Sequence, residues 1–328
     1  MNIIEFVHDA MPAAQPLRVE VVSGAGFELL IGLSSLTRRG TSAPAHAGLR
    51  RALERVGIDS AELWLHLLGV ALEHPHDVVA GVRALDGVEL RRHLVGVHVP
   101  AWQTVVGREA LEATAAGDPR LLDHDRYYAG EARDSLELLL PLSPAQTKRR
   151  VLEVLTRYES VVFDPVSVAE LARDAEAKRR LAVPPDELIE IATGGYRYEP
   201  EPELGRVALV PHLAARPWLL LCQHERTRII CYPVPEEKGL DRRALLLGRA
   251  LGDEGRVAML RRLAAGDATL AELAEAAGLA KSTAHHHLAH LRAAGLVTMH
   301  GNARAYWFTL RAEGFTDARR TLGELAAP

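Results

Sequence analysis

Residues 269–295 read TLAELAEAAGLAKSTAHHHLAHLRAAG, and this stretch decides the fold of the C-terminal part of the chain. Thr269 and Glu272 have the spacing of a capping box, in which each side chain satisfies a backbone amide at the start of a helix. A Gly-Leu-Ala turn then separates two apolar patterns of helical period. The stretch therefore predicts short helices over 270–277 and 281–294, arranged as a helix-turn-helix.

The flanking sequence extends this unit in both directions. Two amphipathic segments precede it, over 241–252 and 253–265, and both have the apolar spacing of helices. After it, residues 296–299 and 305–310 are rich in β-formers and enclose a loop with a Gly-Asn turn at 300–304. We therefore expect a winged helix-turn-helix, with the hairpin as the wing.

The distribution of charge indicates a polyanionic partner. The whole chain has a net charge of −4, but from residue 241 onward 12 Lys and Arg face 9 Asp and Glu. Between Glu275 and Glu313 there is no acidic residue, although this stretch holds four Lys or Arg and five histidines. Cations set against phosphates gain affinity by releasing counterions. Together with a helix that fits the major groove, this pattern predicts double-stranded DNA as the partner.

The segment 251–310, LGDEGRVAMLRRLAAGDATLAELAEAAGLAKSTAHHHLAHLRAAGLVTMHGNARAYWFTL, resembles the winged helix of ArsR-type repressors. The resemblance implies that 281–294 is the recognition helix. Two residues depart from the family pattern: Ala280 stands where a capping Ser is usual, and His285 where Ser is frequent. A weaker resemblance covers the whole chain, to regulators that carry an N-terminal domain of uncharacterised function ahead of the same winged helix.

We expect the DNA contacts to come from the recognition helix and the wing. Side chains outside the apolar stripe of the helix carry donors that suit base edges or phosphates, and the wing tip offers a further cation. The predicted contact residues are Lys281, Ser282, Thr283, His285, His286, His290, Arg292, Asn302 and Arg304. His287 borders the apolar stripe, so we expect it to pack inside the domain instead.

The sequence divides into a domain over 1–238 and the winged helix over 239–328. The N-terminal part opens with a strand at 17–22 and continues to about residue 191 as amphipathic helices. A β-rich segment follows at 206–232, and a linker rich in Pro, Gly and charge at 233–239. The predicted class is therefore α+β, mostly α: a helical N-terminal domain with a small β-region, plus a C-terminal winged helix-turn-helix.

Several classes of function are excluded by what the sequence lacks. It has no phosphate loop, dinucleotide loop, nucleophile elbow or zinc-protease helix, so we expect no enzyme and no cofactor. It has no apolar run of membrane-spanning length and no secretory signal, which favours the cytoplasm. Cys222 and Cys231 would face each other across a hairpin if its loop were 225–228, and we expect ordinary thiols there.

The metal sites that the family resemblance implies are missing. The helix at 270–277 has no cysteine and the last helix has no histidine, so we expect no metal site. Three histidine pairs remain as weaker alternatives: His286 with His290, His74 with His76, and His93 with His98.

These features predict a DNA-binding transcriptional regulator. A short recognition helix reads few base pairs, so we expect a homodimer, with the helices at 241–252 and 313–325 as its interface, as in the family. The N-terminal domain would sense a small-molecule effector and the protein would act as a repressor. Two alternatives stay open: an N-terminal domain that serves only protein interaction or oligomerisation, and an enzyme domain tethered to DNA.

Overall fold

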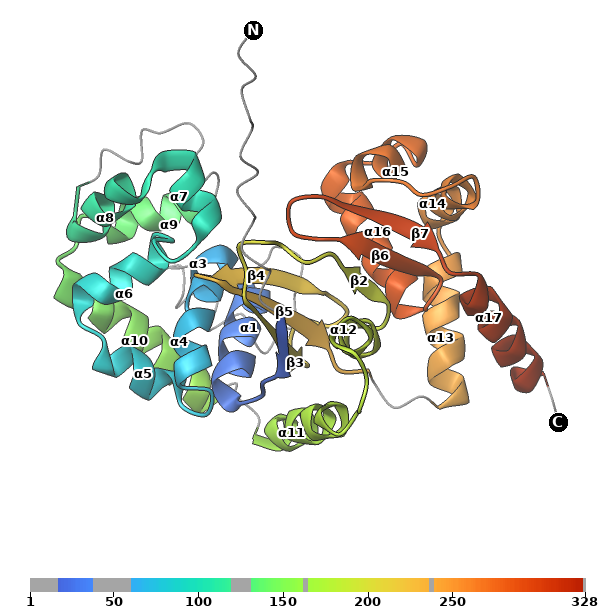
Figure 1. Ribbon diagram of the computed structural model, residues 1–328, viewed down its shortest axis with the longest axis horizontal. Coiled ribbons are helices and arrows are strands. Elements are labelled where there is room, and N and C mark those ends of the chain that lie inside the picture. The colour runs from blue at the N-terminus through green and yellow to red at the C-terminus, as the bar shows by residue number, and fades with distance from the viewer. Residues whose placement is uncertain (1–16, 38–59, 119–130, 162–164, 236–238, 327–328) are drawn as a thin grey trace, which may run out of the picture.

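The computed structural model describes residues 17–37, 60–118, 131–161, 165–235 and 239–326. It confirms the predicted class, because helices dominate and the strands form two small sheets (Figure 1). A helical lobe lies at one end of the molecule, a four-stranded sheet in the middle and the winged helix at the other end. No helix in the described ranges has the length and apolar character needed to cross a membrane.

The helical lobe is built around α1 (Ala25–Thr37), which is apolar on nearly every side. Phe27, Leu30 and Leu33 are fully buried, as expected for a helix surrounded by other elements. Helices α3, α4, α5 and α10 pack against α1. The lobe comprises α3 (Ala61–His66), α4 (Leu68–Glu73), α5 (Val78–Ala84), α6 (Gly87–Leu94), α7 (Pro100–Val106), α8 (Arg108–Ala116), α9 (Glu131–Leu139) and α10 (Pro144–Val161).

The central sheet has the strand order β1-β3-β5-β4. Strands β1 (Arg18–Val21), β3 (Arg206–His212) and β5 (Thr227–Pro233) are parallel, and β4 (Leu220–His224) pairs antiparallel with β5. Both faces of the sheet are covered, which explains why these strands are continuous apolar runs rather than alternating ones. On β5, Ile229 and Cys231 face the helical lobe. Ile230 and Tyr232 face the opposite side, where α11 (Pro165–Arg179) and α12 (Pro185–Thr193) lie.

The winged helix follows the predicted element order. Its elements are α13 (Leu240–Leu251), α14 (Glu254–Ala264), α15 (Leu270–Ala276), α16 (Lys281–Ala293), β6 (Val297–Gly301), β7 (Tyr306–Leu310) and α17 (Ala312–Leu325). The predicted wing loop at 300–304 is shifted in the structure. Gly301 pairs with Tyr306, so β6 is longer than expected and the loop comprises 302–305.

A third strand joins the wing from the N-terminal part of the chain. Strand β2 (Tyr196–Tyr198) pairs in parallel with β6, which gives a sheet of order β2-β6-β7. The Tyr196 hydroxyl donates a hydrogen bond to the Gly301 carbonyl at 2.9 Å. One apolar cluster also includes residues from β3, β5, α12 and the winged helix. Residues on both sides of position 239 therefore share a core, while the division into two domains at that position stays a prediction. Residues 236–238 of the linker lie outside the described ranges.

The β4–β5 hairpin differs from the expected loop. His224 pairs with Thr227, so the turn has two residues and Glu225 takes a left-handed conformation with φ +48°. Cys222 then lies opposite Ile229 rather than opposite Cys231. The two free thiols are diagonal neighbours on one face and hydrogen bond to each other, which together with burial raises the pKa of the Cys231 thiol.

Candidate nucleic-acid interface

Local contacts hold the helix-turn-helix in the predicted form. The Glu272 amide donates to Thr269 Oγ1 at 3.3 Å, and the Thr269 amide donates to Glu272 Oε2 at 2.7 Å. Gly278 follows α15 with φ +65°, a conformation that glycine adopts without strain. Helix α16 begins after Ala280, whose side chain caps no amide. The first-turn amides of α16 therefore remain open to an anionic group from outside the domain.

Helix α16 separates an apolar stripe from a polar face. The stripe packs into the domain through Ala284, Leu288 and Leu291, all buried. The opposite face is exposed and carries most of the predicted contact residues, namely Lys281, Ser282, Thr283, His285 and His286. These five side chains are thus brought together on one solvent-facing surface, as a groove-reading helix requires.

Two histidines of α16 lie on its inner side. Arg256 Nη1 donates to His287 Nδ1 at 2.9 Å, and His287 Nε2 lies 3.7 Å from a carboxylate oxygen of Asp253. Burial lowers the pKa of both His287 and His290, and the positive charge of Arg256 lowers both further. The packed role expected for His287 matches this geometry. His290 was predicted to contact DNA; it is half-buried in the structure, and the contact stays a prediction.

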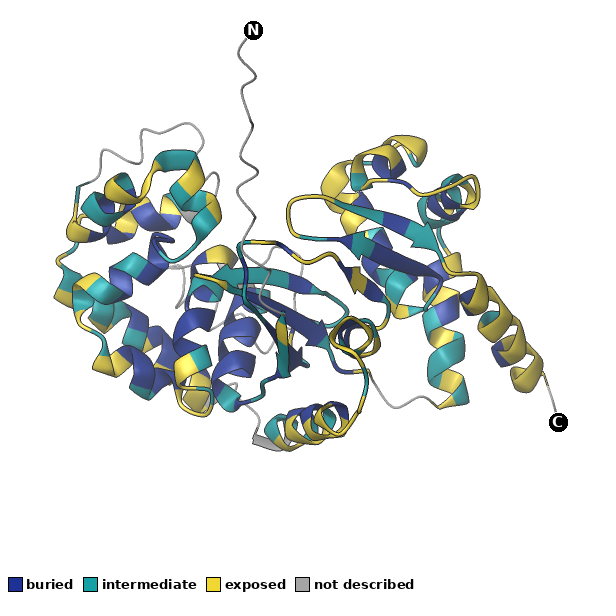
Figure 2. Cartoon of the chain, in the orientation of Figure 1, coloured by how far each residue is buried: buried dark blue, intermediate teal, exposed yellow. Residues whose placement is uncertain are grey.

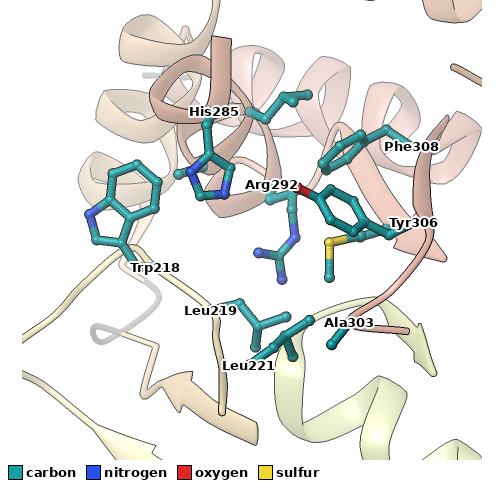
Figure 3. Close-up of a pocket in the computed structure, with 11 residues that line it drawn as sticks. Trp218, Leu219, Leu221, His285, Arg292, Ala303, Tyr306 and Phe308 are labelled. Atoms are coloured by element: carbon teal, nitrogen blue, oxygen red, sulfur yellow. The ribbon is translucent and has the colours of Figure 1, made fainter. Parts of the chain in front are cut away.

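Arg292 points into the pocket between α16 and the segment that holds Leu219 and Leu221 (Figure 3). Its Nη2 donates to the Thr193 carbonyl at 3.3 Å, and burial lowers the pKa of the guanidinium to about 10. The helical period alone puts Arg292 outside the apolar stripe, but its guanidinium bonds to the end of α12. A DNA contact by Arg292 would require this hydrogen bond to be given up, and the contact stays a prediction.

The wing tip carries one exposed cation. Asn302 Oδ1 accepts hydrogen bonds from the amides of Arg304 and Ala305, at 3.0 and 3.3 Å. Asn302, a predicted DNA contact, thus orders the loop with its side-chain oxygen. The Arg304 side chain is 69% exposed and forms an ion pair with Glu203, which belongs to the segment after β2.

Trp218, just before β4, lies against the middle of α16. Its ring centroid is 5.1 Å from that of His285 and 4.6 Å from that of His286. Between this residue, α16 and the wing there is a pocket of about 220 Å³. Figure 3 shows its lining, with Trp218 and His285 at one side and Arg292 reaching inward; Leu219, Leu221 and Tyr306 close other sides.

Three features of this interface were missed in the sequence. Strand β2, Glu203 and Trp218 all come from the part assigned to the N-terminal domain, yet each contacts α16 or the wing. Glu203 also supplies a carboxylate to a surface that contains no acid of its own between residues 275 and 313. The sequence places the tryptophan in an Arg-Pro-Trp segment at 216–218, but no local pattern shows which surface it contacts.

Comparison with known proteins identifies the fold of this unit. The model of a family described as "Bacterial regulatory protein, arsR family" matches residues 253–299, which span α14, α15, α16 and the start of β6. Neither a curated protein nor a solved structure matches the chain.

Proposed function

We propose that this ArsR-type DNA-binding transcriptional regulator is a cytoplasmic, dimeric repressor whose N-terminal region senses a small molecule. The family match supports the DNA-binding part. The observation that carries the sensing part is the contact of Trp218 with His285 and His286 on the reading helix. A region that touches the DNA-reading face can control whether that face is available.

Sequence reading would depend on the exposed face of α16. Lys281, Ser282 and Thr283 lie in its first turn, where side chains and amides reach phosphates and base edges. His285 and His286 offer ring nitrogens to base edges in the groove. Arg304 at the wing tip would contact a phosphate or the minor groove. Because the stretch around these residues lacks acids, the phosphate contacts meet little internal repulsion.

The N-terminal region would hold this surface in a closed arrangement. The indole of Trp218 occupies space beside His285 and His286 that the walls of a major groove would need. The Glu203 carboxylate pairs with Arg304, so this cation must exchange one anion for another to reach a phosphate. DNA binding therefore competes with two internal contacts, and a signal that changes either contact changes the affinity for DNA.

The pocket beside Trp218 is suited to receive that signal. It has apolar walls, including Leu219 and Leu221, with Arg292 and His285 as polar groups. Pockets at the junction of two regions are common ligand sites. A ligand that bridges Trp218 and α16 favours the closed arrangement and releases DNA, which is the behaviour of a repressor relieved by its inducer. A pocket that combines apolar walls with polar groups in this way favours sensing over a purely structural association module.

Helices α13 and α17 would form the dimer interface. They pack against each other and extend from the winged helix side by side (Figure 1), with α17 largely exposed in Figure 2. Five of the nine exposed large apolar side chains in the described residues lie on these two helices: Leu245, Leu251, Phe315, Leu322 and Leu325. Several exposed large apolar side chains on two packed helices are typical of an association site. A symmetric dimer doubles the short sequence that one α16 can read.

Selection of DNA fragments from random sequence by the full chain tests this proposal. We expect enrichment of a two-fold symmetric site whose half-sites are separated by about one helical turn, roughly 34–36 Å. Enrichment should disappear with the Lys281→Ala, Arg304→Ala double variant. Selection without any sequence preference by the folded wild-type protein would contradict the proposed role of α16.

A further inference from the structure

Three histidine rings meet in the N-terminal lobe, far along the chain from the DNA-reading surface. His93 lies on α6, His98 in the turns that follow α6, and His224 at the end of β4. The ring centroid of His93 is 4.5 Å from that of His98 and 5.4 Å from that of His224. The ring centroids of His98 and His224 are 5.0 Å apart. The fold thus brings His224 to a pair that is more than 120 residues earlier in the sequence.

A carboxylate completes this cluster. Glu89 and His93 are four residues apart on α6, so their side chains share one face of the helix. Glu89 Oε1 lies 3.2 Å from His98 Nε2. One potential ligand atom from each of Glu89, His93 and His98 lies within 4.8 Å of the other two. We propose that these three residues bind a divalent transition-metal ion, with an open fourth position beside His224.

His93 offers an unbonded ring nitrogen. Its side chain is 7% exposed, and its Nδ1 has no hydrogen-bond partner within the part of the chain that the structure describes. The ring also forms a hydrogen bond to the backbone carbonyl of His66, which leaves Nδ1 as the acceptor nitrogen. A buried polar atom without a partner is costly, and a metal ion would satisfy it. Metal-binding histidines characteristically donate their other ring N–H to a carbonyl or carboxylate in this way.

The other two ligands have the same kind of support. His98 Nδ1 lies 3.4 Å from Glu225 Oε1, so a carboxylate can accept its ring proton while Nε2 faces the metal position. The Glu225 amide also donates to the His98 carbonyl at 2.7 Å, which fixes the hairpin turn against this loop. Arg92 Nη1 donates to Glu89 Oε2 at 2.6 Å and leaves Oε1 directed at His98. Each ligand is therefore oriented by a neighbour outside the set.

The chemistry of the set favours a metal of the zinc class. Imidazole nitrogens together with one carboxylate are typical ligands of Zn²⁺ and similar ions, at about 2.0–2.2 Å. Tetrahedral coordination at these bond lengths places the ligand atoms about 3.3 Å from one another. The ligand atoms now lie within 4.8 Å of one another, so the side chains would rotate toward the ion when it binds.

Binding of Zn²⁺ to the full-length protein, freed of metal with a chelator, tests this site. In competition with a chromophoric chelator, we expect one tightly bound Zn²⁺ per chain and at least a tenfold weaker affinity for His98→Ala and Glu89→Gln. Two matched histidine variants should retain wild-type affinity. His76→Ala removes an exposed ring outside the cluster. His286→Ala breaks the alternative metal-binding pair that His286 forms with His290 on α16.

The outcomes separate this site from the alternatives. Equal Zn²⁺ affinity in His98→Ala and wild type, or loss of binding in His286→Ala, would overturn the assignment. Absence of stoichiometric binding by the wild type would overturn the proposal itself. His98 and Glu89 are only partly buried, and circular dichroism verifies that their variants are folded. The absorption of bound Co²⁺ gives a second readout, because it should report nitrogen and oxygen ligands and change in both ligand variants.

Discussion

Replacement of Trp218 by alanine should strengthen DNA binding, because this side chain lies against the reading helix. The variant loses two ring contacts, to His285 and His286, at centroid separations of 5.1 and 4.6 Å. Such pairs contribute about 0.5–1.5 kcal/mol each, so the closed arrangement loses about 1–3 kcal/mol. A coupling of this size corresponds to an affinity about 5- to 150-fold higher. The gain follows because apparent affinity scales with the fraction of chains that are competent to bind.

Fluorescence anisotropy with the selected site at fixed ionic strength measures this effect. Trp218→Phe retains a ring at the contact and should change the affinity much less. Trp102→Ala removes a half-buried indole from α7 that packs against the core of the helical lobe, and it should leave DNA affinity unchanged. A folded Trp218→Ala protein with equal or weaker affinity would refute the idea that this contact opposes DNA binding.

Three further changes test other contacts. Glu203→Gln frees the cation of the wing, and since exposed ion pairs contribute about 0.2–1 kcal/mol, DNA affinity should rise about 1.5- to 5-fold. The neighbouring Glu199→Gln removes the same charge from a residue that has no ion pair with any described residue, so its effect should be smaller. Equal gains in the two variants would contradict the pairing argument. Leu322→Glu should convert the proposed dimer to a monomer in light scattering. Leu181→Glu changes an exposed apolar residue of the N-terminal part and should leave the protein dimeric. If both variants were dimeric, α17 would be excluded as the interface. Thr269→Ala should lower the free energy of unfolding by about 0.5–2 kcal/mol in denaturant titrations, and an unchanged midpoint would show that the capping box contributes little.

The winged helix could be predicted from the sequence because its signals are local. A capping box, a glycine turn and an apolar stripe each depend on residues within a few positions of one another, and the structure has all three. The exposed face of α16 followed from the same periodicity. The order of helices and strands from residue 240 onward was therefore predictable, apart from the wing loop, which begins two residues later than expected.

The features that regulate this unit could not be predicted in the same way. Strand β2 has only three residues, and its partner β6 begins about a hundred residues later. Arg292 has the right helical position for DNA contact, but its guanidinium donates to the carbonyl of Thr193, about a hundred residues earlier. His224 joins His93 and His98 only because the β4–β5 hairpin is fixed against the loop after α6. In each case the decisive contact joins segments far apart in the sequence, and no local pattern encodes it.

The salt dependence of DNA binding by Lys281→Ala tests most directly whether α16 reads DNA. Lys281 is exposed in the first turn of α16, and a phosphate contact there adds about 0.9 to the slope of log K against log salt concentration. We predict that Lys281→Ala binds more weakly to every DNA sequence and that its slope is smaller by about this amount. Arg226→Ala, at the exposed turn of the β4–β5 hairpin, should keep the wild-type slope. An unchanged slope for Lys281→Ala would contradict the assignment of α16 to the DNA.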